Sequence, residues 1–132
     1  TEIGAGVLAN SPKLESVIIP ATVTNIGSLA FAYTDLASVH IPAAVTNIGQ
    51  GAFYKATKLA TVTFEEGTAP LMLGNLISKV DGDRGRGVFE GTSLTKITIP
   101  DSVTSIGVNV FECCDSLQTI IVENGNNNYK SI

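Results

Sequence analysis

Three stretches of the chain are nearly identical: IPATVTNIGSLAF at residues 19–31, IPAAVTNIGQGAF at 41–53 and IPDSVTSIGVNVF at 99–111. Each is the tail of a repeat unit of roughly 23 residues, a period typical of solenoid proteins. In a solenoid, each coil buries its apolar side chains against the neighbouring coils. The repetition therefore predicts a stack of coils and not a globule closed around one active-site cleft.

A leucine opens each repeat unit: Leu14, Leu36, Leu59, Leu94 and Leu117. After it, apolar and mostly polar residues alternate, as in Leu36-Ala-Ser-Val39-His-Ile41. Alternation with a period of two is the signature of a half-buried strand. We therefore expect five strands that stack in parallel, one per coil. Proline follows three of them and ends the strand, because it has no backbone N–H to donate.

The second half of each repeat contains a Val-Thr-Asn/Ser-Ile-Gly segment and then a phenylalanine. We expect the segment to form a bend, with its valine and isoleucine pointing inward. Its glycine (Gly27, Gly49 or Gly107) either takes a positive φ or lets neighbouring coils approach closely. The phenylalanine lies in a stretch about one helical turn long, which predicts a short helix on the outer arc with rings stacked between coils.

The repeats divide one domain, residues 1–132, into coils. A partial coil at 1–13 precedes coils at 14–35, 36–58, 59–93 and 94–116, and a terminal strand at 117–122 is followed by a tail at 123–132. The third full coil carries an inserted loop near 75–87, whose glycines and charges predict that it protrudes. Neither end has an obvious polar cap. Because an open solenoid end exposes strand edges, we expect the chain to be a fragment of a longer protein.

The repeated pattern Leu-x-x-Ile/Val-x-Ile-Pro-x-x-Val-Thr-x-Ile-Gly-x-x-Ala/Val-Phe resembles that of the BspA-type leucine-rich repeat proteins. Residues 14–58 and 94–122 match it closely, 59–93 loosely and 1–13 in part. The resemblance implies a right-handed open arc of about five coils, with a parallel β-sheet on the concave side and short helices or turns on the outer arc. Cys114 matches a cysteine that family members often carry three residues after the phenylalanine. The stretch 126–132 looks like the passage into a further repeat.

The resemblance also implies a function. Members are surface and secreted proteins of gut and oral bacteria and of some protist parasites, so an extracellular binding or adhesion module is expected. Its partner would be a protein, either of the host extracellular matrix or another surface protein. The location rests on the resemblance alone, because Thr1-Glu2-Ile3-Gly4 shows no basic region followed by an apolar stretch.

Composition argues against several other classes of function. A net charge of −4 with only eight Lys and Arg residues disfavours a nucleic-acid or anionic-membrane surface. No apolar run approaches the ~20 residues needed to span a bilayer. No glycine-rich phosphate loop followed by lysine occurs, and we predict no cofactor. The two cysteines, Cys113 and Cys114, are adjacent and so poorly placed to bond to each other.

Catalysis and metal binding find little support either. The only histidine, His40, lies on the solvent side of its strand without an acid to orient it, which favours an exposed sheet histidine over a catalytic base. A polysaccharide hydrolase needs two carboxylates, and neither outward column of the strands contains one. Asp81-x-Asp83-x-Gly85 resembles a calcium loop only at its start, and the neighbouring arginines oppose a cation. We predict no enzyme and no metal site.

What remains is the outer face of the strands, where residues vary between coils while the inward positions stay apolar. The candidate binding surface consists of Ser38, His40, Thr61, Thr63, Lys96 and Thr98, flanked by Arg84 and Arg86 of the inserted loop. Five strands offer only about 200 Å², against about 800 Å² per partner in a stable interface. A solvated face on a structural spacer is therefore the alternative, with a polysaccharide hydrolase less favoured.

Overall fold

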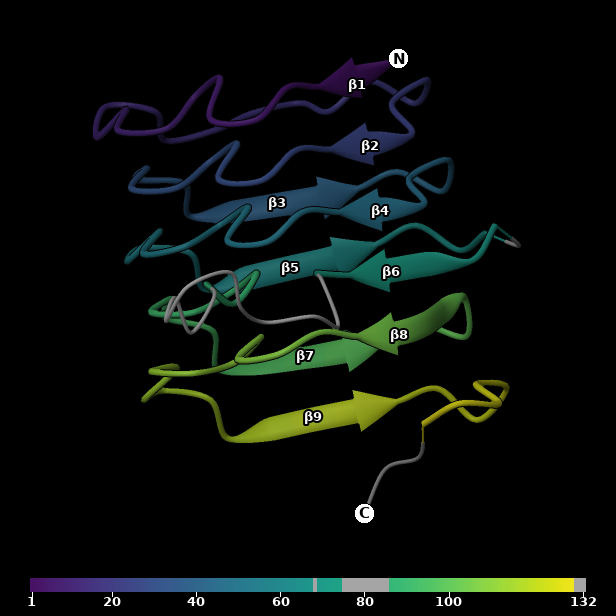
Figure 1. Ribbon diagram of the computed structural model, residues 1–132. Helices are drawn as coiled ribbons and strands as arrows, with labels where there is room; N and C mark the ends of the chain where they lie inside the picture. Colours follow the sequence, from purple (N-terminus) through teal and green to yellow (C-terminus); the bar gives the residue numbers. More distant parts are fainter. Residues whose placement is uncertain (68, 75–85, 130–132) are drawn as a thin grey trace, which may run out of the picture.

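The chain forms a stack of parallel coils that crosses the molecule twice per repeat (Figure 1). The computed structural model describes residues 1–67, 69–74 and 86–129. One crossing runs along the strand after the leucine, and the other runs in the opposite direction along the Val-Thr-Asn-Ile-Gly segment (Figure 1). Each repeat thus contributes to two sheets, and the predicted solenoid is confirmed.

The Val-Thr-Asn-Ile-Gly segments form a continuous parallel sheet in the order β1-β2-β4-β6-β8. Its strands are β1 (Glu2–Ile3), β2 (Asn25–Ile26), β4 (Asn47–Ile48), β6 (Leu71–Leu73) and β8 (Val103–Ile106). The register repeats from coil to coil, so that Ile26 pairs with Ile48 and Ile48 with Leu73. These three side chains are fully buried. The segment predicted as a bend is thus a short strand with the expected inward residues.

Glycine closes this segment because neighbouring coils touch there. A Cβ atom on Gly27 or Gly49 would lie 2.5 Å from a backbone nitrogen of the preceding coil, that of Ala5 or Ser28 respectively. Neither glycine has a positive φ, so close approach, the second of the two expectations, explains both positions.

The second sheet consists of two separate parallel pairs. In one, β3 (Ser38–Ile41) pairs with β5 (Thr61–Phe64), and in the other, β7 (Lys96–Ile99) pairs with β9 (Thr119–Val122). The expectation of five stacked strands is therefore wrong in two details. Residues 14–19 form no strand, and β5 lies beside β7 without a hydrogen-bonded ladder between them.

The residue that follows each strand accounts for this split. Glu65 and Glu123 donate their backbone N–H to the Ile41 and Ile99 carbonyls of the preceding coil, at 2.8 and 3.0 Å. Pro42 and Pro100 occupy the same position after β3 and β7 but have no N–H to donate. The ladder forms where the later coil has glutamate and is missing where it has proline.

The outer arc contains turns where short helices were expected; within the described ranges 1–67, 69–74 and 86–129 there is no helix. Left-handed residues stand two positions before and after Phe31, Phe53 and Phe111, and two positions after Phe89, which rules out a continuous right-handed helix. In the second full coil they are Gly51 (φ 64°) and Lys55 (φ 51°). Moreover, the backbone N–H of Phe53 donates to the Val88 carbonyl of the next coil at 2.9 Å, so this donor bonds across the stack and not within a helix.

The core is a column of stacked rings and aliphatic side chains. Successive ring centroids of Phe31, Phe53, Phe89 and Phe111 lie 5.3, 5.6 and 6.1 Å apart and the planes are nearly parallel, as predicted. The inward strand residues Val39, Val62 and Ile97 are buried. Ile120 of β9, in the same column, is 43% exposed because no described coil covers it.

Side chains of the tail bond to backbone groups of the coil 94–116. The Asn126 amide donates to the Pro100 and Val103 carbonyls at 2.9 and 3.1 Å. The Tyr129 hydroxyl accepts the Ile106 N–H at 2.9 Å, at the edge of β8. Backbone groups of that coil are thus satisfied by side chains of the tail.

Candidate functional site

Four of the predicted surface residues form two cross-strand pairs on the β3–β5 ladder. Ser38 lies opposite Thr61, and His40 lies opposite Thr63. All four are exposed, because alternate residues of a strand point to opposite faces. The Nδ1 atom of His40 and the hydroxyl of Thr63 are hydrogen-bonded at 2.9 Å, which fixes the imidazole ring against the neighbouring coil.

Lys96 and Thr98 belong to the other ladder. They pair with Thr119 and Ile121 of β9, and β7 lies next to β5 without a ladder. Lys96 is exposed and Thr98 is half-buried. The structure therefore places the six strand residues on neighbouring coils of one face, but on two hydrogen-bonded units.

Arg86, one of the two arginines of the inserted loop, does not join this face. Arg86 stands over the ring of Tyr54, 5.5 Å from its centroid, among the turns that contain the phenylalanines. Arg84 and the Asp81-x-Asp83-x-Gly85 stretch, in which no metal site was predicted, lie outside the described residues. The position of Arg86 could not be read from the sequence, because it depends on where the insertion returns to the stack.

An apolar side chain at one end of the strand face was not among the candidates. Ile18 is 93% exposed and occupies the outward position equivalent to His40 one coil later. The period-2 alternation contained this signal, since it placed Ile18 on the outside. Its exposure places a hydrophobic contact point at one end of this face, and the half-buried Ile121 of β9 stands in the same outward column at the other end.

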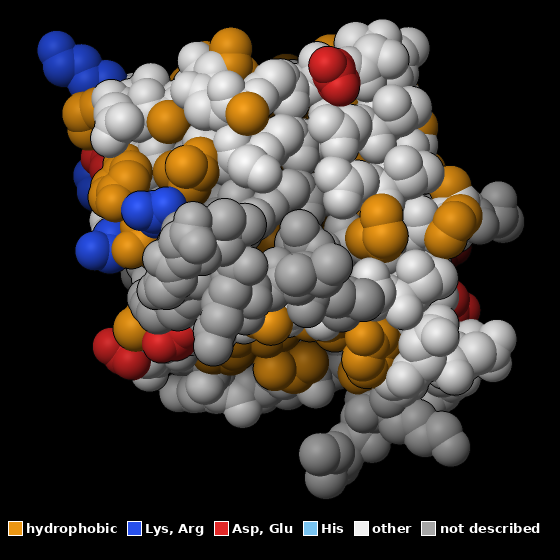
Figure 2. Space-filling model, in the orientation of Figure 1, with side chains coloured by type: hydrophobic (Ala, Val, Ile, Leu, Met, Phe, Trp, Pro, Cys, Tyr) orange, Lys and Arg blue, Asp and Glu red, His pale blue; other side chains and the backbone are white. Residues whose placement is uncertain are grey.

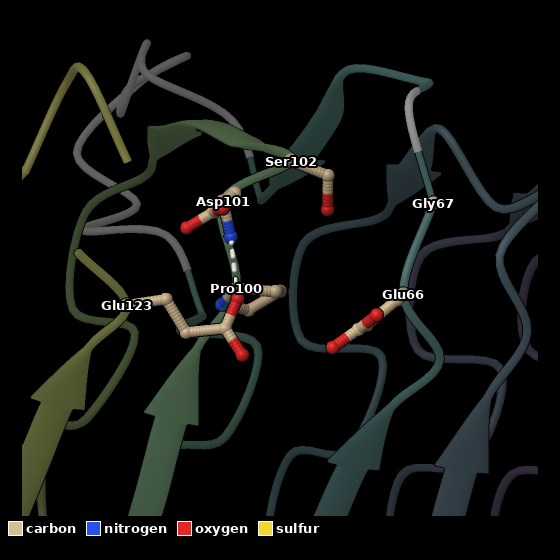
Figure 3. A pocket seen from close by; sticks show the side chains of 6 residues that line it. All are labelled: Glu66, Gly67, Pro100, Asp101, Ser102 and Glu123. Atoms are coloured by element: carbon tan, nitrogen blue, oxygen red, sulfur yellow. Dashed lines mark hydrogen bonds between the residues drawn. The ribbon is translucent and has the colours of Figure 1, made fainter. Parts of the chain in front are cut away.

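A pocket of about 360 Å³ lies where the chain leaves the strands β5, β7 and β9 (Figure 3). Its lining residues are Glu66, Gly67, Pro100, Asp101, Ser102 and Glu123. A carboxylate oxygen of Glu123 accepts the backbone N–H of Asp101 at 3.1 Å, while Glu66 reaches in from the opposite side (Figure 3). Glu65 holds Ala43 in the same way, at 3.0 Å. The carboxylates of Glu65 and Glu123 therefore each bind a backbone N–H in the turn of a preceding coil.

The acids in this pocket do not assemble into a metal centre. Within the described part of the chain, no three histidine, cysteine, aspartate or glutamate side chains come together in a way that could hold a metal ion. Sequence reasoning missed the pocket, although an acid one or two residues after the strand in neighbouring coils was a readable signal. No helix in the described ranges is long and apolar enough to cross a bilayer.

The cysteines take structural positions. Cys113 is exposed and Cys114 is buried, and both are free. The Cys114 thiol donates to the Phe89 carbonyl at 3.0 Å, and the equivalent Thr34 and Thr92 hydroxyls bind the carbonyls of Phe31 and Phe89. In three coils the buried position three residues after the ring thus takes a small donor that satisfies a backbone carbonyl, whereas the coil of Phe53 has Ala56 there.

Residues 1–71 and 83–132 match six copies of the BspA-type leucine-rich repeat region. The chain belongs to this family. Among solved structures, this BspA-type repeat protein is similar to the crystal structure of the pneumococcal vaccine antigen PcpA, with a TM-score of 0.70 and 30% sequence identity. The similarity covers 83% of this chain and 25% of that one, so the chain spans about a quarter of its length. No curated protein sequence matches the chain.

Proposed function

We propose that this segment is a non-enzymatic protein-binding or adhesion module of a cell-surface or secreted protein, and that it binds through the outer face of β3, β5, β7 and β9. Membership of the leucine-rich repeat family supports a recognition role, because stacked repeats present extended binding surfaces. The similar pneumococcal protein is described as a vaccine antigen, which fits a surface location.

One observation supports the choice of this face as the binding surface. Inward strand positions are alike from coil to coil (Val39, Val62, Ile97), and all three are buried. The outward positions between them differ in chemistry: His40 and Thr63 offer a hydrogen-bonded pair, and Lys96 offers a positive charge. Packing constrains the first set, while the second is free to specify a partner.

The area of the strand face limits the expected binding affinity. Strands lie about 4.8 Å apart, so this face offers far less than the roughly 800 Å² per partner of a stable interface. The segment alone should therefore bind weakly, with dissociation constants on the order of micromolar or weaker.

Binding of host extracellular-matrix proteins to the immobilised chain tests the proposal. The triple variant His40→Ala/Lys96→Ala/Thr98→Ala should lose binding to any matrix protein that the unmodified chain captures. A matched control, Lys13→Ala/Thr57→Ala, changes two exposed residues away from this face and should retain it. Unchanged affinity in the triple variant would show that the binding surface lies elsewhere.

A spacer without its own ligand is the second candidate, favoured by the small serine- and threonine-rich face. Serine and threonine are uncommon among the residues that dominate binding energy. A spacer predicts that no matrix protein is captured, and that deleting whole coils from the longer protein shortens its reach without changing affinity.

A further inference from the structure

A cluster of tyrosines and cations lies on the turns around the phenylalanines, away from the strand face. This turn cluster consists of Tyr33, Tyr54, Lys55 and Arg86. It brings together two of the three tyrosines and one of the two arginines of a chain that has no tryptophan. Tyrosine and arginine are the residue types, besides tryptophan, that most often dominate binding energy at protein interfaces.

The two tyrosine rings contact each other, and only Tyr33 is exposed. Tyr54 is 8% exposed, and Tyr33 meets it edge-on, with centroids 5.5 Å apart and planes at 82°. Tyr33 itself is 43% exposed. A tyrosine held by a buried ring but open to solvent loses little side-chain freedom when a partner covers it.

Two positive charges surround the same buried ring. The ammonium group of Lys55 and the guanidinium group of Arg86 each lie 5.5 Å from the Tyr54 centroid. Neither forms an ion pair with any residue that the structure describes. Nearby Lys58 differs: Asp35 binds its ammonium group at 2.7 Å, and this hydrogen bond raises the pKa of Lys58.

The backbone holds the cluster in place. Tyr33 and Lys55 stand at equivalent positions, two residues after the phenylalanine, and both have left-handed backbones (φ 58° and 51°). The Tyr33 N–H donates to the Tyr54 carbonyl at 2.9 Å, and the Lys55 N–H donates to the Glu90 carbonyl at 2.8 Å. Inter-coil hydrogen bonds thus fix the turns from which these side chains project.

The acid that replaces Tyr54 in the next coil has a buried side chain. Glu90 occupies the position of Tyr54 one coil later, but its side chain is buried and accepts the Gly87 N–H at 3.0 Å. Figure 2 shows Lys and Arg side chains at the left edge of the molecule, on the side of these turns, with hydrophobic side chains beside them and acidic side chains along the same edge.

We propose that the turn cluster is a second binding site, separate from the strand face, which takes an acidic segment of a partner protein. Arg86 and Lys55 supply charge-assisted hydrogen bonds to carboxylates. Tyr33 supplies the exposed apolar surface on which the segment packs. The strand face offers neither tyrosine nor arginine within the described residues, so the two faces suit partners of different chemistry.

A fluorescein-labelled octaglutamate peptide tests the site by fluorescence anisotropy at low salt on the full 132-residue chain. The variant Lys55→Gln/Arg86→Gln should weaken binding about tenfold, and Tyr33→Ala about fivefold. The control Lys13→Gln/Lys58→Gln removes the same charge from exposed lysines outside both proposed sites and should change affinity less than about twofold. Each variant should have the same melting temperature as the unmodified chain, which establishes that its coils remain intact.

Two results would overturn the proposal: equal loss of affinity in the control and cluster variants, or no octaglutamate binding to the unmodified chain at about millimolar concentration. Dextran sulfate serves as a second probe. If it binds through the same residues about tenfold more tightly than octaglutamate, the ligand is an anionic polysaccharide and the proposed acidic protein segment is wrong. Because His40→Ala/Lys96→Ala/Thr98→Ala spares the turn cluster, its octaglutamate binding separates this site from the strand face.

Discussion

At the residue scale, stability depends on a few positions that repeat in every coil. Phe53 stacks between Phe31 and Phe89 and is fully buried, so each face of its ring contacts another ring. Stacked aromatic pairs contribute about 0.5–1.5 kcal/mol beyond the burial of their area. A central phenylalanine should therefore be among the most sensitive residues of the chain.

Replacement of Phe53 by alanine should lower the free energy of unfolding by about 3–5 kcal/mol, because it removes both ring contacts and leaves a cavity. Denaturant titration followed by circular dichroism measures the loss. Phe53→Leu keeps much of the volume and should cost clearly less. A loss below about 1 kcal/mol for the alanine variant would contradict the buried stack.

Glycine at the end of the Val-Thr-Asn-Ile-Gly segment gives a second test. Gly49→Ala should destabilise the protein by about 1–3 kcal/mol, because the new Cβ atom would lie 2.5 Å from the backbone nitrogen of Ser28. Gly4→Ala is the matched control, because a Cβ atom on Gly4 meets nothing within 4 Å and its φ is not positive. Equal melting temperatures for the two variants would show that the coils can separate at no cost.

At the element scale, the residue after each strand decides whether the strand joins its neighbour. The Glu65 backbone bonds to Ile41, and its carboxylate bonds to the N–H of Ala43 at 3.0 Å. Pro42 and Pro100 stand at the equivalent position and provide neither contact. The strand sheet is therefore segmented, whereas the sheet of β1, β2, β4, β6 and β8 is continuous.

Two substitutions of Glu65 separate the contribution of its carboxylate to stability from that of its backbone N–H. Glu65→Ala removes only the carboxylate and should cost about 0.5–1.5 kcal/mol of unfolding free energy. Glu65→Pro also removes the N–H that bonds to Ile41 and should cost a further amount of similar size. Backbone strain is not expected, because proline occupies this position in other coils. Faster amide exchange in β5 for the proline variant alone checks the mechanism, and equal exchange in both variants would contradict it.

Much of this architecture could be predicted, because the length of the repeat and the two-residue alternation within it each have a direct structural meaning. Alternation around Val39 identified the inward column, and recurrence of phenylalanine identified the ring stack. The helix prediction failed because the turn signal lies in residues such as Gly51 and Asn109, whose left-handed backbones alternate with the ring. Glycine and asparagine favour that conformation, so the signal was present. Leu29 and Tyr33 adopt it without such a signal, because inter-coil hydrogen bonds hold them there.

The candidate site was less predictable. The strand residues came directly from alternation, but Arg86 depends on the path of an insertion that matches no other coil. The pairing of Tyr33 with Tyr54 depends on turns that the sequence suggested were helical. A site assembled from adjacent repeats can be read from periodicity, and a site that includes an insertion cannot.

At the scale of the whole molecule, each coil contacts only its neighbours, so stability should vary along the stack. Hydrogen bonds between coils occur in three zones: the continuous sheet, the segmented sheet and the turns. Gly49 N–H to the Ile26 carbonyl (2.7 Å) and Phe31 N–H to the Ala52 carbonyl (2.7 Å) belong to central coils. Repeat proteins behave approximately as a sum of units and nearest-neighbour interfaces.

A comparison of the same substitution at two coils tests this view. Phe111 is half-buried and has one described ring neighbour, Phe89 at 6.1 Å, whereas Phe53 has two. Phe111→Ala should therefore cost about 1–2 kcal/mol, less than half the cost at Phe53. Native-state hydrogen exchange should show the same gradient, because end coils open without the rest of the stack: the Glu123 amide exchanges faster than the amides of Phe31 and Gly49. Equal costs at the two phenylalanines, with uniform exchange along the chain, would instead show that the coils unfold only as a single cooperative unit.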